Sequence, residues 1–409
     1  MKPSHIAIIT ELGNGHVYPV LPLCSELVKR GHCVTYATSH HYSRAIYETG
    51  SEPVVFRCIP LNRELQDEVK NSRLLSCNDP AWWKFARAFQ VYRFAFAEEI
   101  LAQLLPFYQE KVPDVILYDH DMFVGRILAR RLNCAAIQIS AHFAQYRKFL
   151  VRENGVFRTP EAAFEYSRGL DSFLSTHGIT TSDNASHIES LNIHLIPREF
   201  QYGDGFFDER FCFVGALLNR PFNQTWVNNS NGRPLILISD MSGLRYAWEH
   251  SNSFYRLFID ALSDAECHCI LSVGDDFDEH ALGSLPENFE INQCASHLEI
   301  LPHAALSVCH GGMLSTLEAL YNGVPVLALP VHPGTEEVSY RTAELGLGIQ
   351  MLRSNLTVEK ARVAVEAILS DTLLRTRVKE IQRVFEKSGG AQLAADRIER
   401  FIVARPAVS

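Results

Sequence analysis

Two histidine-centred groups in the sequence have residue types and spacing that suit chemistry. The first is His16, which follows the turn Glu11-Leu12-Gly13-Asn14-Gly15 and precedes Pro19 in the first turn of an expected helix. A helix N-terminus disfavours positive charge, so this imidazole is expected to stay neutral near pH 7 and to accept a proton from a hydroxyl group. The apolar run 114–119 ends in Asp119, whose carboxylate could orient His16 if the two segments are neighbouring strands.

The residues alone leave a second interpretation of these two side chains open. His16 can equally be a surface histidine, and Asp119 can be the residue that caps a following helix, because aspartate is favoured at that position.

The second group follows the apolar run 305–309 and reads His310-Gly311-Gly312, with Ser315 and Glu318 further along an expected helix. Two glycines between a strand and a helix allow a diphosphate to approach the positive end of the helix. His310 and Ser315 can donate to phosphate oxygens, and Glu318 can accept from ribose hydroxyls. The alternative is a tight turn whose glycines only start the helix.

Alternating strands and helices must position these groups, and the alternation occurs twice. Short apolar runs indicate strands, and apolar residues at helical spacing indicate the helices between them. The first series has strands at 5–10, 34–38, 114–119 and 135–140 with helices after the first and at 122–132. The second has strands at 235–239, 269–273, 305–308 and 324–329 with helices at 253–262 and 314–321. Each series predicts a doubly wound α/β domain, in which ligands bind where the strands end.

A polar stretch rich in turn residues separates the two series. We therefore predict an N-terminal domain at 1–215, a linker at 216–232, a second domain at 233–385 and a C-terminal helix at 386–409.

Composition limits the class of protein. The chain has 409 residues, 47% of them hydrophobic and 21% charged, and a net charge of -9, which argues against nucleic acid as a partner. It contains no long apolar run and its start lacks a signal-peptide pattern, so the expected location is the cytoplasm. The ten cysteines are scattered, as is typical of reduced core thiols. The first turn has Tyr18 where a dinucleotide fingerprint needs a third glycine, which argues against a nicotinamide or flavin enzyme.

The sequence as a whole resembles the family 1 glycosyltransferases of the GT-B fold, particularly the bacterial macrolide and natural-product branch. The motifs that carry the resemblance are Gly15-His16-Val17-Tyr18-Pro19, the turn at Leu117-Tyr118-Asp119, and the stretch from His297 to Gly348. The resemblance implies two doubly wound Rossmann-like domains that face each other across a cleft, with the final helix packed on the first domain. It implies that the domain at 1–215 binds the acceptor and that the domain at 233–385 binds the nucleotide-sugar donor. It also implies that His16 is the catalytic base, that Asp119 is its partner, and that His310, Gly311, Gly312, Ser315 and Glu318 bind the nucleoside diphosphate.

Three departures from the family pattern concern the donor. Relatives have tryptophan, proline and glutamine where this chain has Cys294, Ser296 and His297, so an indole for stacking on the base is absent. Gly334 and Thr335 replace an acidic residue and a glutamine that hold glucose hydroxyls. This predicts a sugar with fewer hydroxyls, or else a loop that uses Glu336 and Glu337. Met241-Ser242 replaces a Gly-Ser or Gly-Thr pair, and Ser242 is expected to reach the β-phosphate.

The acceptor is expected to meet aromatic residues of the first domain. Phe85, Phe89 and Tyr92 share one face of an expected helix, and His142-Phe143 follows the strand at 135–140. Each of these can also be an ordinary core residue, but together they favour a pocket for a lipophilic compound.

The resemblance predicts an inverting transfer of a hexose or deoxyhexose from a UDP- or dTDP-sugar to a hydroxyl of a small lipophilic acceptor, without a metal ion or other cofactor. A non-catalytic homologue that binds the donor and acts as a partner protein is one alternative, and a sugar-nucleotide epimerase is another. The sequence does not determine the nucleotide base or the sugar of the donor, the identity of the acceptor, or whether the chain forms a homodimer.

Overall fold

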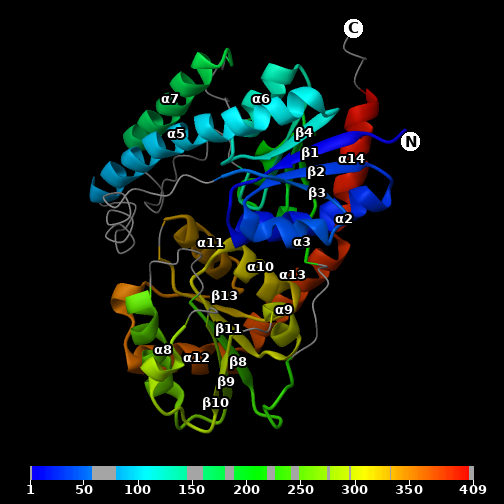
Figure 1. The fold of residues 1–409 in the computed structure, drawn as a ribbon. Coiled ribbons are helices and arrows are strands. Elements are labelled where there is room, and N and C mark those ends of the chain that lie inside the picture. Colours follow the sequence, from blue (N-terminus) through cyan, green and yellow to red (C-terminus); the bar gives the residue numbers. More distant parts are fainter. Residues whose placement is uncertain are drawn as a thin grey trace. The chain divides into compact units, whose positions relative to one another are not determined.

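The computed structural model describes residues 2–57, 80–144, 160–179, 188–218, 226–240, 248–273, 277–293, 296–331 and 333–404. The chain divides into two compact units, Met1–Arg220 together with Ser388–Ser409, and Pro221–Lys387 (Figure 1). The sequence-based prediction put the corresponding boundaries at 215, 233 and 386. Among the described residues, no helix combines the length and the apolar character needed to cross a membrane.

The first unit contains a seven-stranded parallel sheet with the order β3-β2-β1-β4-β5-β6-β7. Its strands are β1 (His5–Ile9), β2 (Cys33–Thr38), β3 (Glu52–Val55), β4 (Val115–Asp119), β5 (Ala135–Ser140), β6 (Asn192–His194) and β7 (Phe211–Phe213). Its helices are α1 (Asn14–Val17), α2 (Leu21–Lys29), α3 (Ser43–Tyr47), α5 (Pro80–Glu110), α6 (Val124–Leu132), α7 (Pro160–Thr176) and α14 (Gly390–Ala404).

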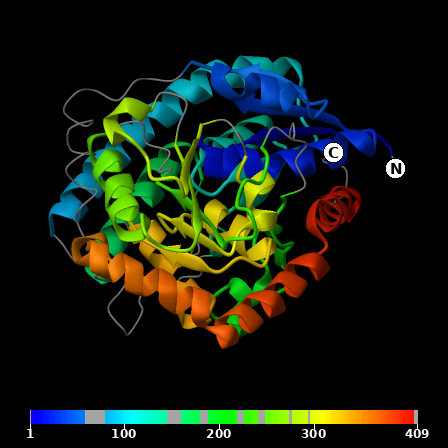
Figure 2. The same cartoon turned by 90° about the horizontal axis from the view of Figure 1, so that it is seen from below.

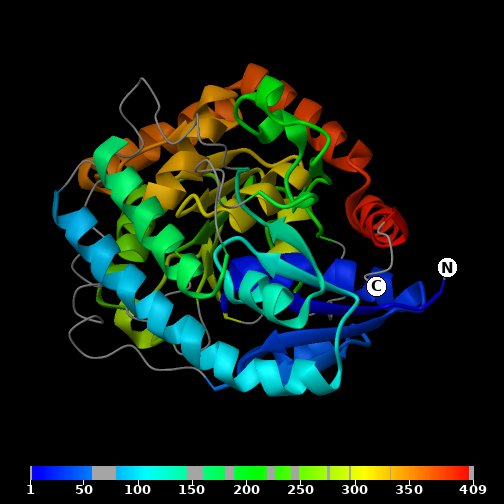
Figure 3. The same ribbon diagram turned by 90° about the horizontal axis from the view of Figure 1, so that it is seen from above.

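Helices cover both faces of this sheet, so its strands are apolar on both sides. In β1, Ile6 and Ile8 pack towards α2, α3 and α14, whereas Ala7 and Ile9 pack towards α5, α6 and α7. Helices α5 and α7 lie side by side (Figures 1 and 3).

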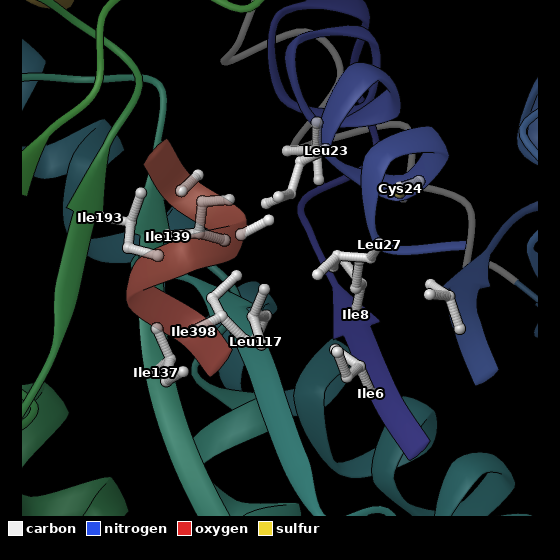
Figure 4. Close-up of a cluster of buried hydrophobic side chains, with 14 of the residues drawn as sticks. Ile6, Ile8, Leu23, Cys24, Leu27, Leu117, Ile137, Ile139, Ile193 and Ile398 are labelled. Atoms are coloured by element: carbon white, nitrogen blue, oxygen red, sulfur yellow. The ribbon is translucent and has the colours of Figure 1, made fainter. Parts of the chain in front are cut away.

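Helix α14 returns to the first unit from the far end of the chain. Ile398 is fully buried beside residues of β1, β4 and β5 (Figure 4). Arg30, which follows α2, lies 2.6 Å from Asp396 and 2.9 Å from Glu399 through Nη1. Glu399 also lies 3.1 Å from Nε2 of His32. Apolar packing and this charged group together fix α14 against α2.

The second unit contains a six-stranded parallel sheet with the order β10-β9-β8-β11-β12-β13. Helices α8 and α12 lie side by side (Figures 1 and 2), and α10 packs against α13. The strands are β8 (Leu235–Ser239), β9 (His268–Ser272), β10 (Phe289–Asn292), β11 (Leu306–Cys309), β12 (Val326–Ala328) and β13 (Gly348–Gln350). The helices are α8 (Trp248–Leu262), α9 (His297–Ile300), α10 (Met313–Tyr321), α11 (Pro333–Glu344), α12 (Val358–Ser370) and α13 (Thr372–Lys387).

The strand order of each sheet reverses direction at one place. In the first sheet the reversal lies between β1 and β4, and in the second between β8 and β11. Loops diverge at such a point and leave room for ligands beyond the carboxyl ends of the strands. His16 lies in the segment after β1 and Asp119 is the last residue of β4, while His310 directly follows β11 of the second pair.

Candidate active site

His16 and Asp119 are in contact at the carboxyl edge of the first sheet. Strands β1 and β4 are parallel neighbours with Ile9 opposite Tyr118, so the turn after β1 lies beside the end of β4. Nδ1 of His16 lies 2.6 Å from Oδ2 of Asp119. Because an ionised carboxylate can only accept, Nδ1 carries a proton, and Nε2 is the nitrogen available to a substrate.

The protonation of His16 differs from the sequence-based expectation of a neutral imidazole. Burial disfavours the imidazolium, but the carboxylates of Asp119, Glu11 and Asp121 outweigh it and raise the pKa of His16 to about 10. The expected helix N-terminus is only the four-residue helix α1, and His16 lies in its last turn. The nearby carboxylates therefore determine the charge of this side chain.

Asp119 is buried and has contacts on both carboxylate oxygens. Its Oδ1 lies 3.1 Å from Nδ1 of His120 and accepts from the backbone N–H of Asp121. Although burial disfavours the charged form, His16 and His120 hold the pKa of Asp119 well below its usual range. Asp119 thus stays ionised and can stabilise a proton on His16 without taking it.

His120 and Asp121 extend this group of charges, which the sequence-based prediction did not include. Nε2 of His120 lies 3.1 Å from Oδ2 of Asp121, and Nη1 of Arg93 on α5 lies 3.2 Å from Oδ1 of the same carboxylate. Ligand atoms of Asp119, His120 and Asp121 lie within 4.8 Å of one another, a spacing that a small cation could use. Each carboxylate already faces two cationic side chains, so we assign the group to ion pairs and not to metal binding.

His142 and Phe143, both predicted to contact the acceptor, lie in different environments. The ring of His142 lies 5.0 Å from that of His16. Burial, together with His16 and His120, lowers the pKa of His142 to about 4, so its ring is neutral. Phe143 is 5% exposed and stacks on Phe200 at 5.6 Å, so it is a core residue and the predicted acceptor contact is not supported.

Helix α5 carries the other predicted acceptor residues. The rings of Phe89 and Tyr92 are 6.0 Å apart, and the rings of Tyr92 and Phe96 are 5.9 Å apart. All three side chains are partly exposed, so they form an aromatic row on one face of α5. The side chain of Phe85 lies outside the described residues.

In the second unit, both glycines after β11 are required by close packing. Gly311 has a φ of +71°, and a Cβ there would lie 2.0 Å from Oγ of Ser339. A Cβ on Gly312 would lie 2.5 Å from Nε2 of His310. Gly312 precedes α10, and no side chain caps that helix end. The glycines thus keep the imidazole and the N-terminus of α10 close together.

His310 is neutral and its Nδ1 lacks a hydrogen-bond partner among the described residues. Burial lowers its pKa to about 4, with contributions from the positive charges of Arg353 and His297. A neutral imidazole can donate one hydrogen bond to a phosphate oxygen without requiring a proton from solvent.

His297 and Glu318 are brought together from different elements. Nε2 of His297 lies 2.9 Å from Oγ of Ser272 at the end of β9, and its Nδ1 lies 3.8 Å from Oε2 of Glu318 on α10. Glu318 is 4% exposed, whereas Ser315 is partly exposed in the first turn of α10. Ser296 is the N-cap of α9 and forms a capping box with Glu299.

The residues predicted to bind the sugar lie at the start of α11. Thr335 is 3% exposed, and its hydroxyl accepts from the backbone N–H of Val331 at 3.0 Å, so it has a structural contact, and the sugar contact stays a prediction. Gly334 is exposed in the first turn of α11. Met241, Ser242 and Cys294 lie outside the described residues.

Arg353 is a further residue at this edge that the sequence-based prediction missed. Its guanidinium contacts the carboxylate of Asp240, after β8, with Nη1 3.2 Å from Oδ2, and its Nε lies 3.3 Å from the carbonyl oxygen of Leu329, after β12. Strand β11 lies between β8 and β12, so this side chain spans the edge beside His310. Asp240 could have been predicted from the sequence, because it directly follows an apolar strand. Arg353 has no such position in the sequence pattern.

Comparison with known proteins identifies the family to which this chain belongs. Residues 256–387 match the model of the erythromycin biosynthesis protein CIII-like C-terminal domain. The chain is 34% identical to NDP-glycosyltransferase YjiC of Bacillus subtilis (strain 168), over 98% of both chains. It is 30% identical to demethyllactenocin mycarosyltransferase of Streptomyces fradiae, over 97% of this chain and 86% of the relative.

A solved structure agrees over the full length. The crystal structure of CalG4, the calicheamicin glycosyltransferase, superposes with a TM-score of 0.80 at 28% identity and covers 100% of both chains. These relatives are named as glycosyltransferases, so neither a sugar-nucleotide epimerase nor a non-catalytic partner protein is supported. The chain is a glycosyltransferase and belongs to the family 1 glycosyltransferases of the GT-B fold, in the branch of the macrolide and natural-product enzymes.

Proposed function

We propose that this enzyme transfers a hexose or deoxyhexose from a UDP- or dTDP-sugar to a hydroxyl group of a small lipophilic acceptor, with inversion at the anomeric carbon. The observation that carries the proposal is the 2.6 Å contact between His16 and Asp119. It leaves Nε2 of His16 for the acceptor and keeps an ionised carboxylate on the opposite nitrogen.

In the proposed reaction His16 acts as a general base in the form that carries its proton on Nδ1 alone, which the raised pKa of His16 makes the minor form at pH 7. Nε2 takes the hydroxyl proton while the acceptor oxygen attacks the anomeric carbon, and the bond from that carbon to the diphosphate oxygen breaks. Attack opposite the leaving group inverts the configuration. Asp119 stabilises the imidazolium that forms, since its own pKa is too low to take the proton.

The second unit is proposed to hold the donor. The nucleoside diphosphate acquires negative charge as it leaves, and the N-terminus of α10 and an N–H of His310 supply the compensating dipoles. These groups make a metal ion unnecessary in this proposal. Glu318 is proposed to accept from ribose hydroxyls, and Nδ1 of His297 lies 3.8 Å from its Oε2.

The surroundings of α11 favour a sugar with few hydroxyls. Gly334 has no side chain to offer, and the Thr335 side chain is buried with its hydroxyl accepting from the backbone N–H of Val331. Each missing hydrogen bond removes about 0.5 to 1.5 kcal/mol of net binding energy for a hydroxyl. We therefore propose a deoxyhexose as the preferred sugar, unless Glu336 and Glu337 supply substitutes.

The acceptor is proposed to bind near the aromatic row of α5 and His142. Phe89 and Tyr92 offer apolar faces of the kind that lipophilic ligands use, and His142 is neutral next to the base.

The test is a transfer assay with UDP-glucose and dTDP-deoxyhexose donors and a panel of aromatic and macrolide alcohols, with products measured by mass spectrometry. The anomeric proton coupling in the product reports inversion. His16→Gln should abolish transfer while nucleotide affinity, measured by calorimetry, stays within about twofold, because the base and donor residues lie in different units. His40→Gln, at an exposed position of the same unit, is the matched control. Equal loss of binding and transfer in His16→Gln would refute the assigned roles.

A further inference from the structure

The charged side chains around His16 form a closed ring in which acidic and basic groups alternate. Starting from His16, each neighbour lies within 4.0 Å of the next. The ring runs through His16, Asp119, His120, Asp121, Arg93 and Glu11 and returns to His16.

Glu11 completes the ring on the side of His16 that faces away from Asp119. Its Oε2 lies 4.0 Å from Nε2 of His16, and Arg93 holds the same oxygen at 3.9 Å through Nη2. The two carboxylates therefore bracket the imidazole, one at each nitrogen. Nε2 is the nitrogen that meets the acceptor in the proposed reaction, so Glu11 acts at the point where the proton arrives.

We propose that Glu11 is a positioning residue of the base, which stabilises the positive charge that His16 gains when Nε2 takes the acceptor's proton and then passes that proton to solvent. The inference rests on the proposed function of His16 as the general base.

The proton and electron movements balance without a further reactant. The acceptor O–H bond breaks, its proton moves to Nε2, and its electron pair forms the bond to the anomeric carbon. The N–H bond at Nε2 then breaks, the proton forms a carboxylic acid with Glu11, and that acid loses it to water.

Glu11 suits this task and Asp119 does not. The Asp119 side chain is 3% exposed and is held by two imidazoles and a backbone N–H, so it can neither take a proton easily nor pass it to water. The Glu11 side chain is 35% exposed. Its surroundings raise the pKa of Glu11, with desolvation outweighing Arg93 and His16, which makes it the better temporary carrier.

Other titratable groups near His16 do not offer an equivalent route. His142 after β5 and His194 in β6 are neutral, because burial lowers the pKa of each to about 4. His120 is held between two carboxylates, which raise its pKa against the effect of burial. The carboxylates that set the charge of His16 are thus Asp119 and Asp121 at the end of β4 and Glu11 from the turn after β1. Arg93 from α5 acts on Glu11, and His120 acts on Asp119.

The experiment compares the titration of His16 by NMR in the wild-type protein and in Glu11→Gln, a change that keeps the shape and removes the charge. A carboxylate within about 4 to 6 Å shifts a pKa by about 1 to 3, and the partial exposure of Glu11 and the presence of Arg93 put the expected decrease near 1. The acidic limb of kcat/KM for an acceptor should move down by the same amount. On the alkaline side of that limb, where His16 is neutral in both proteins, kcat should fall more than KM changes. The resonance is assigned by its absence in His16→Gln.

Two further variants separate this role from a general effect of substitution. Glu11→Asp keeps the charge, so its His16 pKa and its kcat should lie between those of Glu11→Gln and the wild-type protein. Glu48→Gln removes a carboxylate that pairs with Arg44 on the exposed surface of the same unit, and it should leave both unchanged.

A pKa of His16 that is the same in wild type and Glu11→Gln would overturn the proposal. So would a shifted titration with an unaltered kcat and pH profile, since Glu11 would then not take part in proton release. The titration needs no substrate. Failure of the wild-type enzyme to transfer any sugar would therefore count against the proposed function, while a lower His16 pKa in Glu11→Gln would still support the electrostatic role of Glu11.

Discussion

Replacement of Asp119 by asparagine should lower activity by an amount that depends strongly on pH. Asparagine keeps the shape of the side chain but removes the charge that lies 2.6 Å from Nδ1 of His16. The pKa of His16 is about 10 in the structure against an ordinary value of 6.5. The difference, about 3.5, corresponds to roughly 5 kcal/mol of preference for the imidazolium, most of which comes from Asp119 and its neighbours.

Two effects of this substitution oppose each other. Without Asp119 the pKa of His16 falls towards 6.5, so a larger fraction of the base is neutral at pH 7. The imidazolium formed in the transition state also loses its partner, and general-base catalysis of this kind contributes about 10² to 10⁴ in rate. Above about pH 10, where wild-type His16 is neutral, only the second effect remains. The loss should therefore approach 10² to 10⁴ there and be much smaller at pH 7.

The assay is the pH dependence of kcat/KM for an acceptor between pH 6 and 10.5, at saturating donor. Wild type should rise towards pH 10, and Asp119→Asn should level off several pH units earlier. A constant ratio between the two enzymes across this range would refute the reasoning, because it would mean that Asp119 does not set the pKa of His16.

Three further predictions concern the donor site and stability. Glu318→Ala should weaken nucleoside diphosphate binding by about 1 to 3 kcal/mol in calorimetry, because ribose hydroxyls would lose a charged acceptor. Gly312→Ala should weaken diphosphate binding but spare the free nucleoside, because its Cβ would lie 2.5 Å from Nε2 of His310 and displace that ring. In urea unfolding, Asp119→Asn should reduce the free energy of unfolding most between about pH 4 and 6.5. The raised pKa of His16 adds stability below pH 6.5, and this stability is lost as the pH rises towards 10. The lowered pKa of Asp119 adds stability that is lost in acid.

Controls for these variants lie on the same units. Glu344→Gln changes an exposed carboxylate of α11 that pairs with Arg341, and nucleotide affinity should stay within twofold. Gly205→Ala adds a methyl group where no atom lies within 4 Å, so stability should change little. An unaltered dissociation constant in Glu318→Ala would argue against ribose binding by Glu318. Equal losses of affinity for nucleoside and nucleoside diphosphate in Gly312→Ala would argue against a phosphate role for His310. A loss of stability in Asp119→Asn that is independent of pH would argue against the ion pair of Asp119 with His16.

Much of the fold was predictable because strands buried on both faces are continuous apolar runs. The expected strands at 135–140 and 235–239 match β5 and β8, and β1 and β4 differ from their predicted bounds by one residue. The three-residue strands β6 and β7 were missed. Asn192 and His194 are polar residues in β6, and so short a segment has no usable periodicity.

The site was predictable only where its residues lie at the carboxyl ends of strands or in the turns after them. That rule found His16, Asp119 and His310, whose catalytic and binding roles stay predictions. It did not find Arg93, which reaches the site from the middle of α5. The charge on His16 was also predicted incorrectly, because it depends on the distances to three carboxylates and not on the helix that carries it.

The return of α14 to the first unit has a consequence for synthesis on the ribosome. An N-terminal domain usually folds while the rest of the chain is still being made. Here Ala394, Ala395 and Ile398 belong to the core of the first unit, yet they are translated after every residue of the second. The apolar side chains of the first unit that pack on α14, among them Leu23 and Leu27 of α2, must therefore stay uncovered until α14 has been made. The nascent chain is expected to depend on chaperones most during this interval, and the two units should acquire their final stability in the reverse of their order along the chain.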